Sequence, residues 1–130
     1  MALRVVRLGE PRVKGEGMRL GSVRRPPRGV AKSDFAKRNF YDLWLPELAP
    51  SAELVKTVVG KSLTEKEWAK FTQRYRREMS QAGAHRLLQL LALMSQQTNF
   101  SVGCYCADEA RCHRSILREL LRAAGGKIVR

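Results

Sequence analysis

Acidic residues are scarce in this sequence. It holds 12 Asp and Glu against 25 Lys and Arg, which gives a formal net charge of +13 over 130 residues. Eleven of the basic residues fall within residues 1–40, which contain only three acids. A positive field of this size attracts phosphates, nucleic acids or anionic membrane surfaces, and it does not determine the fold. We therefore expect an anionic partner and an electropositive surface in the N-terminal third.

Long hydrophobic runs and widely spaced cysteines are also missing. The longest apolar stretch, residues 87–94, is too short to cross a bilayer. Arg and Lys interrupt the apolar pairs of residues 1–17, which excludes the hydrophobic core of a secretory signal. All three cysteines lie between 104 and 112, and an odd number in one loop does not make a secreted disulfide framework. These absences predict a cytoplasmic protein with free thiols and no membrane partner.

The order of apolar segments predicts an α/β fold. A chain of this length supports one core, so residues 1–130 are expected to form a single small domain. Extended segments are expected at 3–9, 17–23, 41–51 and 98–106, with residues 127–130 as an edge strand or a trailing end. Helices are expected at 52–60, 64–79 and 84–97, and a last helix is expected to begin between His113 and Ser115 and to run to 126. Interleaved strands and helices indicate a mostly parallel sheet flanked by helices.

Local signals sharpen two of these helices. Ser51 is placed to cap the first, and Thr64 with Glu67 three residues later has the form of a capping box for the second. One face of the second helix carries large apolar side chains at spacings of three and four: Trp68, Phe71, Tyr75 and Met79. This stripe is expected to face the core rather than to stack on bases. His85 is expected at the surface.

The segment SVGCYCADEARCHRSILRELL, residues 101–121, gathers the residues that carry chemistry. It predicts a buried strand, a loop and then a helix, and ligands of open α/β sheets collect where strands end and helices begin. Arg111 and Arg114 bracket the first turn of that helix, where cations are unfavourable unless an anion is bound. We therefore predict a phosphate or carboxylate site there, which includes Ser115. In the alternative, Asp108 and Glu109 pair with the two arginines in an ordinary salt-bridged turn.

The three cysteines allow different roles. Cys112 precedes the helix, where the dipole and the neighbouring Arg111, His113 and Arg114 favour a thiolate, so Cys106 or Cys112 is a candidate nucleophile or redox thiol. Cys104 is expected to be a buried packing residue. A tyrosine-phosphatase loop does not fit, because the arginine after Cys106 comes one residue early. Zinc is disfavoured because the C-x-x-C knuckle is missing, so no metal is assigned and the cofactor is left unknown.

The segment 106–121, CADEARCHRSILRELL, resembles the signature of the domain of unknown function 488 (DUF488) family, a mainly prokaryotic group with a C-terminal R-C-H-R motif. Residues 42–56 and 68–79, and more weakly 19–29, are similar to the branch related to the bacterial protein YeaO. That branch usually has an Asp-Arg-x-Trp-Pro-Arg-Gly run where this chain has residues 23–29, without the acid and the tryptophan. The resemblance implies a small α/β domain with the R-C-H-R loop at a strand–helix junction.

Three functions remain open from the sequence. The first is a binding module for a phosphorylated ligand, a nucleotide or nucleic acid, at the loop Cys106–Ser115, with Arg24, Arg25 and Arg28 converging on that loop. The second is a cysteine-dependent enzyme on such a substrate, with Cys106 or Cys112 as nucleophile and His113 as proton shuttle. In the third, the motif is purely structural and ties down the last helix.

Overall fold

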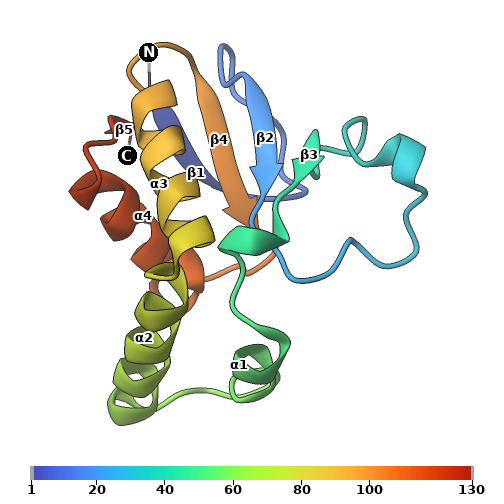
Figure 1. The fold of residues 1–130 in the computed structure, drawn as a ribbon. Coiled ribbons are helices and arrows are strands. Elements are labelled where there is room, and N and C mark those ends of the chain that lie inside the picture. Colours follow the sequence, from blue (N-terminus) through green and yellow to red (C-terminus); the bar gives the residue numbers. More distant parts are fainter. Residues whose placement is uncertain (1, 130) are drawn as a thin grey trace.

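Five parallel strands form the centre of the computed structural model, which describes residues 2–129 (Figure 1). Their order across the sheet is β3-β2-β4-β1-β5. The strands are β1 (Leu3–Arg7), β2 (Met18–Gly21), β3 (Leu43–Trp44), β4 (Phe100–Cys104) and β5 (Ile128–Val129). The α/β fold with a parallel sheet is thus confirmed. Strand β4 is central and pairs with β1 on one side and β2 on the other, so its carboxyl end has a fixed position.

Four α-helices complete the fold: α1 (Ala52–Lys56), α2 (Glu65–Met79), α3 (Ala82–Met94) and α4 (His113–Ala123). The predicted capping box is confirmed, since Thr64 accepts from the backbone N–H of Glu67 and Glu67 accepts from that of Thr64. Ser51 caps α1 by accepting from the backbone N–H of Leu54. Among the described residues, no helix has the length and apolar character needed to span a membrane.

The main core lies between one face of the sheet and the helices. Leu3, Leu20, Phe100 and Val102 of the strands pack there with buried side chains of the helices. The aromatic stripe of α2 is core as predicted: Phe71, Tyr75 and Met79 are buried, and Trp68 packs against them half-buried. His85 is exposed as expected. The helices therefore bury their apolar faces on one side of the sheet.

The other face of the sheet has small residues and is covered by loops. A Cβ added to Gly21 would overlap the Tyr41 ring, and one added to Gly103 would lie 2.6 Å from the Val6 carbonyl oxygen. Arg19 is also buried on this side and bonds Glu16 through its Nε at 2.5 Å. The missing side chains let Leu8, which follows β1, and Tyr41, in the segment after β2, lie directly on the strands.

Several boundaries differ from the expected ones. Strand β4 ends at Cys104 and not at residue 106, because the chain turns toward α4 directly after Cys104. Helix α1 ends at Lys56, and a turn follows up to Gly60, where the backbone has a positive φ. Helix α4 begins at His113, at the early limit of the expected start, and the Cys112 side chain caps it. Residues 128–129 form the edge strand, and Met1 and Arg130 lie outside the described residues.

Candidate functional site

The candidate site is the junction between the central strand β4 and helix α4. After Cys104 the chain passes through a short 3₁₀ turn, Glu109–Arg111, which begins where the Asp108 carboxylate accepts from the Ala110 N–H at 3.0 Å. The Cys112 thiol then caps α4, with its sulfur 3.5 Å from the Arg114 backbone N–H. The positive end of an eleven-residue helix therefore faces this sulfur.

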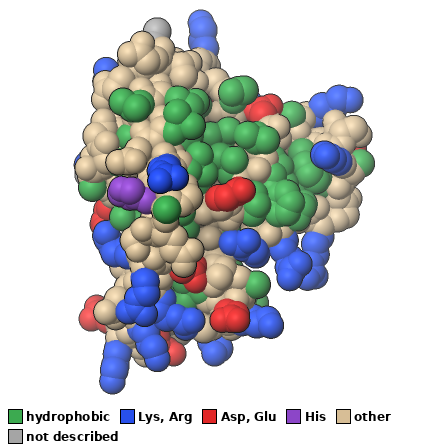
Figure 2. Space-filling view, in the orientation of Figure 1, with side chains coloured by type: hydrophobic (Ala, Val, Ile, Leu, Met, Phe, Trp, Pro, Cys, Tyr) green, Lys and Arg blue, Asp and Glu red, His purple; other side chains and the backbone are tan. Residues whose placement is uncertain are grey.

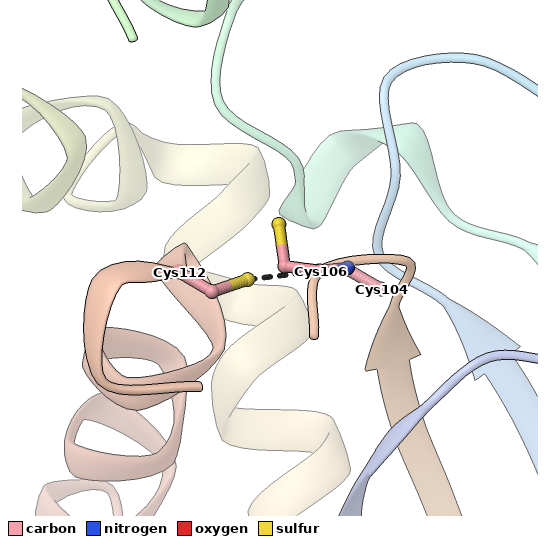
Figure 3. A group of neighbouring side chains, drawn as sticks. All are labelled: Cys104, Cys106 and Cys112. Carbon is pink, nitrogen blue, oxygen red and sulfur yellow. Dashed lines mark hydrogen bonds between the residues drawn. The ribbon is translucent and has the colours of Figure 1, made fainter. Parts of the chain in front are cut away.

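The three cysteines converge in space (Figure 3). The Cys104 and Cys112 sulfurs are 2.8 Å apart, and the Cys106 N–H donates to the Cys104 sulfur at 3.4 Å. All three sulfurs lie within 4.8 Å of one another. Cys104 and Cys112 are buried, whereas Cys106 is exposed. Cys104 is a buried packing residue, as expected, and contacts a small second core that includes Leu8. It also belongs to this thiol cluster.

Contacts within the thiol cluster shift the pKa values of the three thiols in different directions. Hydrogen bonding with Cys104, and then with Cys112, lowers the pKa of Cys106. The same contact with Cys106, together with Cys112 and burial, raises the pKa of Cys104. Contact with Cys104 lowers the pKa of Cys112, but contact with Cys106 and burial outweigh it and raise that pKa to about 11. The first proton lost from the cluster is thus that of Cys106, the exposed member.

His113 is a buried, neutral side chain. Burial lowers its pKa to about 4, against the opposing effect of its bond to the Ser22 carbonyl. Its Nε2 lies 2.7 Å from that carbonyl oxygen, which assigns the proton to Nε2. The other nitrogen, Nδ1, is 3.7 Å from the Cys112 sulfur and accepts from that thiol. The predicted proton shuttle is thus placed beside Cys112, with its ring edge-on to the Tyr75 ring.

The two arginines of the R-C-H-R motif lie in different environments. Arg114 is buried and donates through Nη2 to the Cys106 carbonyl oxygen at 2.6 Å. Arg111 is exposed and lies over the Trp68 ring, 5.6 Å from its centroid. The salt-bridged alternative is wrong in its partners, because Glu109 pairs with Arg118 at 2.8 Å. Arg111 thus has no acidic partner among residues 2–129.

Two other predicted anion ligands bond the backbone. Arg24 donates to the carbonyl oxygens of three residues in the segment before α1, namely Pro46, Ala49 and Pro50. The Ser115 hydroxyl donates to the Cys112 carbonyl oxygen at 2.9 Å, within the first turn of α4. Arg24 still lines the cleft described below, and Ser115 does not.

A large cleft opens over the thiol cluster. Its volume is about 1180 Å³, and its floor includes Cys106, Cys112 and His113. The walls come from the segment after β2, from α1, from the turn that follows α1 and from the 3₁₀ turn before α4. They carry five exposed cationic side chains: Arg25, Arg28, Lys56, Lys61 and Arg111. Lys and Arg side chains also gather over the α1–α2 end of the molecule in Figure 2.

Sequence reasoning missed Lys56 and Lys61 as site residues. They reach the cleft because α1 and the turn after it form part of its lining, and no spacing in the sequence marks that approach. It also left open whether the thiols meet, because Cys112 lies on a different element from Cys104.

The chain is therefore a small parallel α/β protein. Its candidate site is the group of three cysteines where the central strand β4 meets helix α4. The family model of the active DUF488-N3 subclade matches residues 3–125. The chain therefore belongs to the DUF488 family, as the residues around the R-C-H-R motif predicted. Searches of curated proteins and of solved structures each returned no match. The narrower likeness to the YeaO branch stays a prediction.

Proposed function

We propose that the protein binds a phosphorylated ligand, a nucleotide or a nucleic-acid strand, in the cleft over the thiol cluster. The observation that carries this proposal is the charge of the cleft wall. Five exposed cationic side chains line it, against the single acid Asp108, which is engaged in capping the 3₁₀ turn. None of the five forms an ion pair with another described residue. Clefts with one sign of charge concentrate ligands of the other sign.

The apolar part of the cleft supports the same ligand class. Pro26 and Pro27 lie on one wall, Val55 and Val59 on another, and Tyr105 near the floor. Such surfaces suit the flat faces of bases and the sugar, while the cationic rim suits the phosphates. The volume of about 1180 Å³ lies slightly above the roughly 300–1,000 Å³ typical of small-molecule sites, so a nucleotide fits with room for a neighbouring residue of a strand.

Fluorescence anisotropy with a labelled single-stranded oligonucleotide tests the proposal, in buffer with chelator and a non-thiol reductant. We expect saturable binding that weakens steeply with salt, because phosphate contacts release counterions. A nucleoside triphosphate is then added as a competitor. Complete displacement of the oligonucleotide assigns the site to a nucleotide, and weak displacement assigns it to a nucleic-acid strand. Absence of binding of both probes at low salt contradicts the proposal.

A second candidate is a cysteine-dependent enzyme acting on the same ligand. Two observations favour it: Cys106 is the exposed thiol in the cleft floor, and the matching subclade is described as active. In this reaction the Cys106 sulfur donates an electron pair to an electrophilic atom of the ligand, and the leaving group departs with the pair of the broken bond. Cys106→Ser should then bind the ligand normally and release no product. Product release at the wild-type rate from Cys106→Ser removes this candidate and leaves the binding function.

A further inference from the structure

We propose that Cys104, Cys106 and Cys112 together bind one thiophilic metal ion of the Zn²⁺ class, with an open coordination position toward the cleft. The three sulfurs lie within 4.8 Å of one another and come from the end of β4, the turn after it and the start of α4. Figure 3 shows Cys112 extending from α4 toward the bend that carries the other two cysteines. Thiolates are the preferred ligands of Zn²⁺ and of the softer ions.

The spacing of the sulfurs is close to what such an ion requires. Zinc binds thiolate sulfur at about 2.3 Å, so two sulfurs of a tetrahedral site lie about 3.8 Å apart. The Cys104 and Cys112 sulfurs, at 2.8 Å, need to separate by about 1 Å, and the widest pair needs to approach by up to about 1 Å. Side-chain rotation supplies shifts of this size, and Cys106 lies on an exposed turn that leaves it free to adjust.

The surroundings compensate the charge of three thiolates. With a divalent ion the group carries about one negative charge, and unpaired buried charge is costly. The Arg114 guanidinium is 3% exposed and donates to the Cys106 carbonyl oxygen, and the backbone N–H of Arg114 points to the Cys112 sulfur. The Nε of Arg114 is buried without a partner among the described residues. A negatively charged metal–thiolate group would give this donor a neighbouring acceptor charge.

Three protein ligands leave one position for a water or a ligand atom, as in catalytic zinc sites. All three cysteines line the cleft, so that position faces it. His113 stays outside the ligand set, because within residues 2–129 only the three sulfurs form a group with suitable mutual distances. Its bond to the Ser22 carbonyl fixes the ring next to Cys112 as a packing neighbour of that ligand. The proposal goes beyond anion binding and stands without it.

The experiment uses the full chain, freed of metal with a chelator and kept reduced without added thiols. Zn²⁺ is titrated against a chromogenic chelator, Co²⁺ absorption is recorded, and reactive thiols are counted before and after Zn²⁺. We expect one ion per chain, an intense sulfur-to-cobalt charge-transfer band and protection of all three thiols. Cys106→Ser should weaken Zn²⁺ binding on the order of 100-fold or more. His85→Ala, at the exposed histidine, is the matched control and should bind as the wild type does.

Binding that is substoichiometric, that gives no charge-transfer band or that is unchanged in Cys106→Ser overturns the proposal. If Cys106→Ser does not fold, thiol protection in the wild-type chain decides alone. The oligonucleotide-binding experiment uses buffer with chelator, so its result does not depend on metal. The metal and the nucleophile are also distinguishable: one equivalent of Zn²⁺ should protect Cys106 from alkylation, whereas a free nucleophile stays reactive.

Discussion

The Arg114 guanidinium and the Cys106 carbonyl oxygen are 2.6 Å apart, and this bond joins the first turn of α4 to the bend after β4. The side chain is buried and the bond is partly buried, so its loss removes a charged donor from this backbone acceptor. Arg114→Ala should therefore lower the free energy of unfolding by about 2–3 kcal/mol and make the buried thiols reactive. Urea denaturation and thiol counting measure both effects.

The matched control for that change is Arg122→Ala, at an exposed position near the end of α4. Its effect on stability should stay within about 0.5 kcal/mol. If Arg114→Ala is as stable as this control, Arg114 does not hold the bend, and the structural reading of the R-C-H-R motif loses its main support.

Glu16 gives the stability of the fold a dependence on pH. Burial raises its pKa, but hydrogen bonds from Arg19 and Ser101 outweigh burial and hold the pKa below its usual value of 4.5. Because the pKa is lower in the folded state, the carboxylate stabilises the fold fully above pH 4.5, and this contribution is lost as the pH falls through the native pKa.

Glu16→Gln tests this dependence. It should lower the free energy of unfolding at neutral pH by about 3 kcal/mol, because Arg19 is left buried without its counterion. The variant should also lose less stability than the wild type between neutral pH and acid below the native pKa of Glu16. Thermal denaturation across this pH range measures the difference, and parallel curves for the two proteins would contradict the assignment.

Two glycines give a paired test of the sheet. A Cβ at Gly103 would lie 2.6 Å from the Val6 carbonyl oxygen, so Gly103→Ala forces the central strands apart and should cost about 2–3 kcal/mol. Gly83 lies in α3 with nothing within 4 Å of an added Cβ. Gly83→Ala should stabilise the protein by about 0.5–1 kcal/mol, since alanine favours the helix. Calorimetry measures the change in stability of each variant. Changes of the same sign, or of the opposite signs to those expected, would contradict the described packing around the two glycines.

The cleft charges are testable one at a time. Arg28→Gln and Lys61→Gln each remove one cation from the wall, and each should weaken oligonucleotide binding. If the side chain contacts a phosphate, the slope of log affinity against log salt should also fall by about 0.7. Arg122→Gln removes the same charge outside the cleft and should leave the slope unchanged. Equal effects of all three variants would mean that only net charge matters.

What could be predicted from the sequence is what depends on neighbours along the chain. The capping box of Thr64 and Glu67 and the buried stripe of α2 follow from spacings of three and four residues. The order of strands and helices likewise fixed the parallel α/β class, because parallel strands need crossovers. The placement of Cys106, Arg111, Cys112 and Arg114 at one strand–helix junction also follows from that order.

Contacts between distant elements were beyond such reasoning. Arg118, and not Arg111 or Arg114, pairs with Glu109, because the helix rotation that faces Arg118 toward the 3₁₀ turn is set by packing. Arg24 is held by carbonyls of residues 46–50, more than 20 positions away. The C-x-x-C spacing used to judge zinc binding is also a local signal. It did not anticipate three sulfurs within 4.8 Å, because the chain turns back after β4 and brings Cys112 beside Cys104 and Cys106.

Both edges of the sheet are strands of only two residues, β3 and β5. A short edge presents few free N–H and C=O groups, so a strand from another molecule finds little backbone to pair with. The chain leaves β3 through Pro46, which has no N–H to offer. Because both edge strands are this short, the parallel sheet is protected against adding strands from other molecules and forming aggregates.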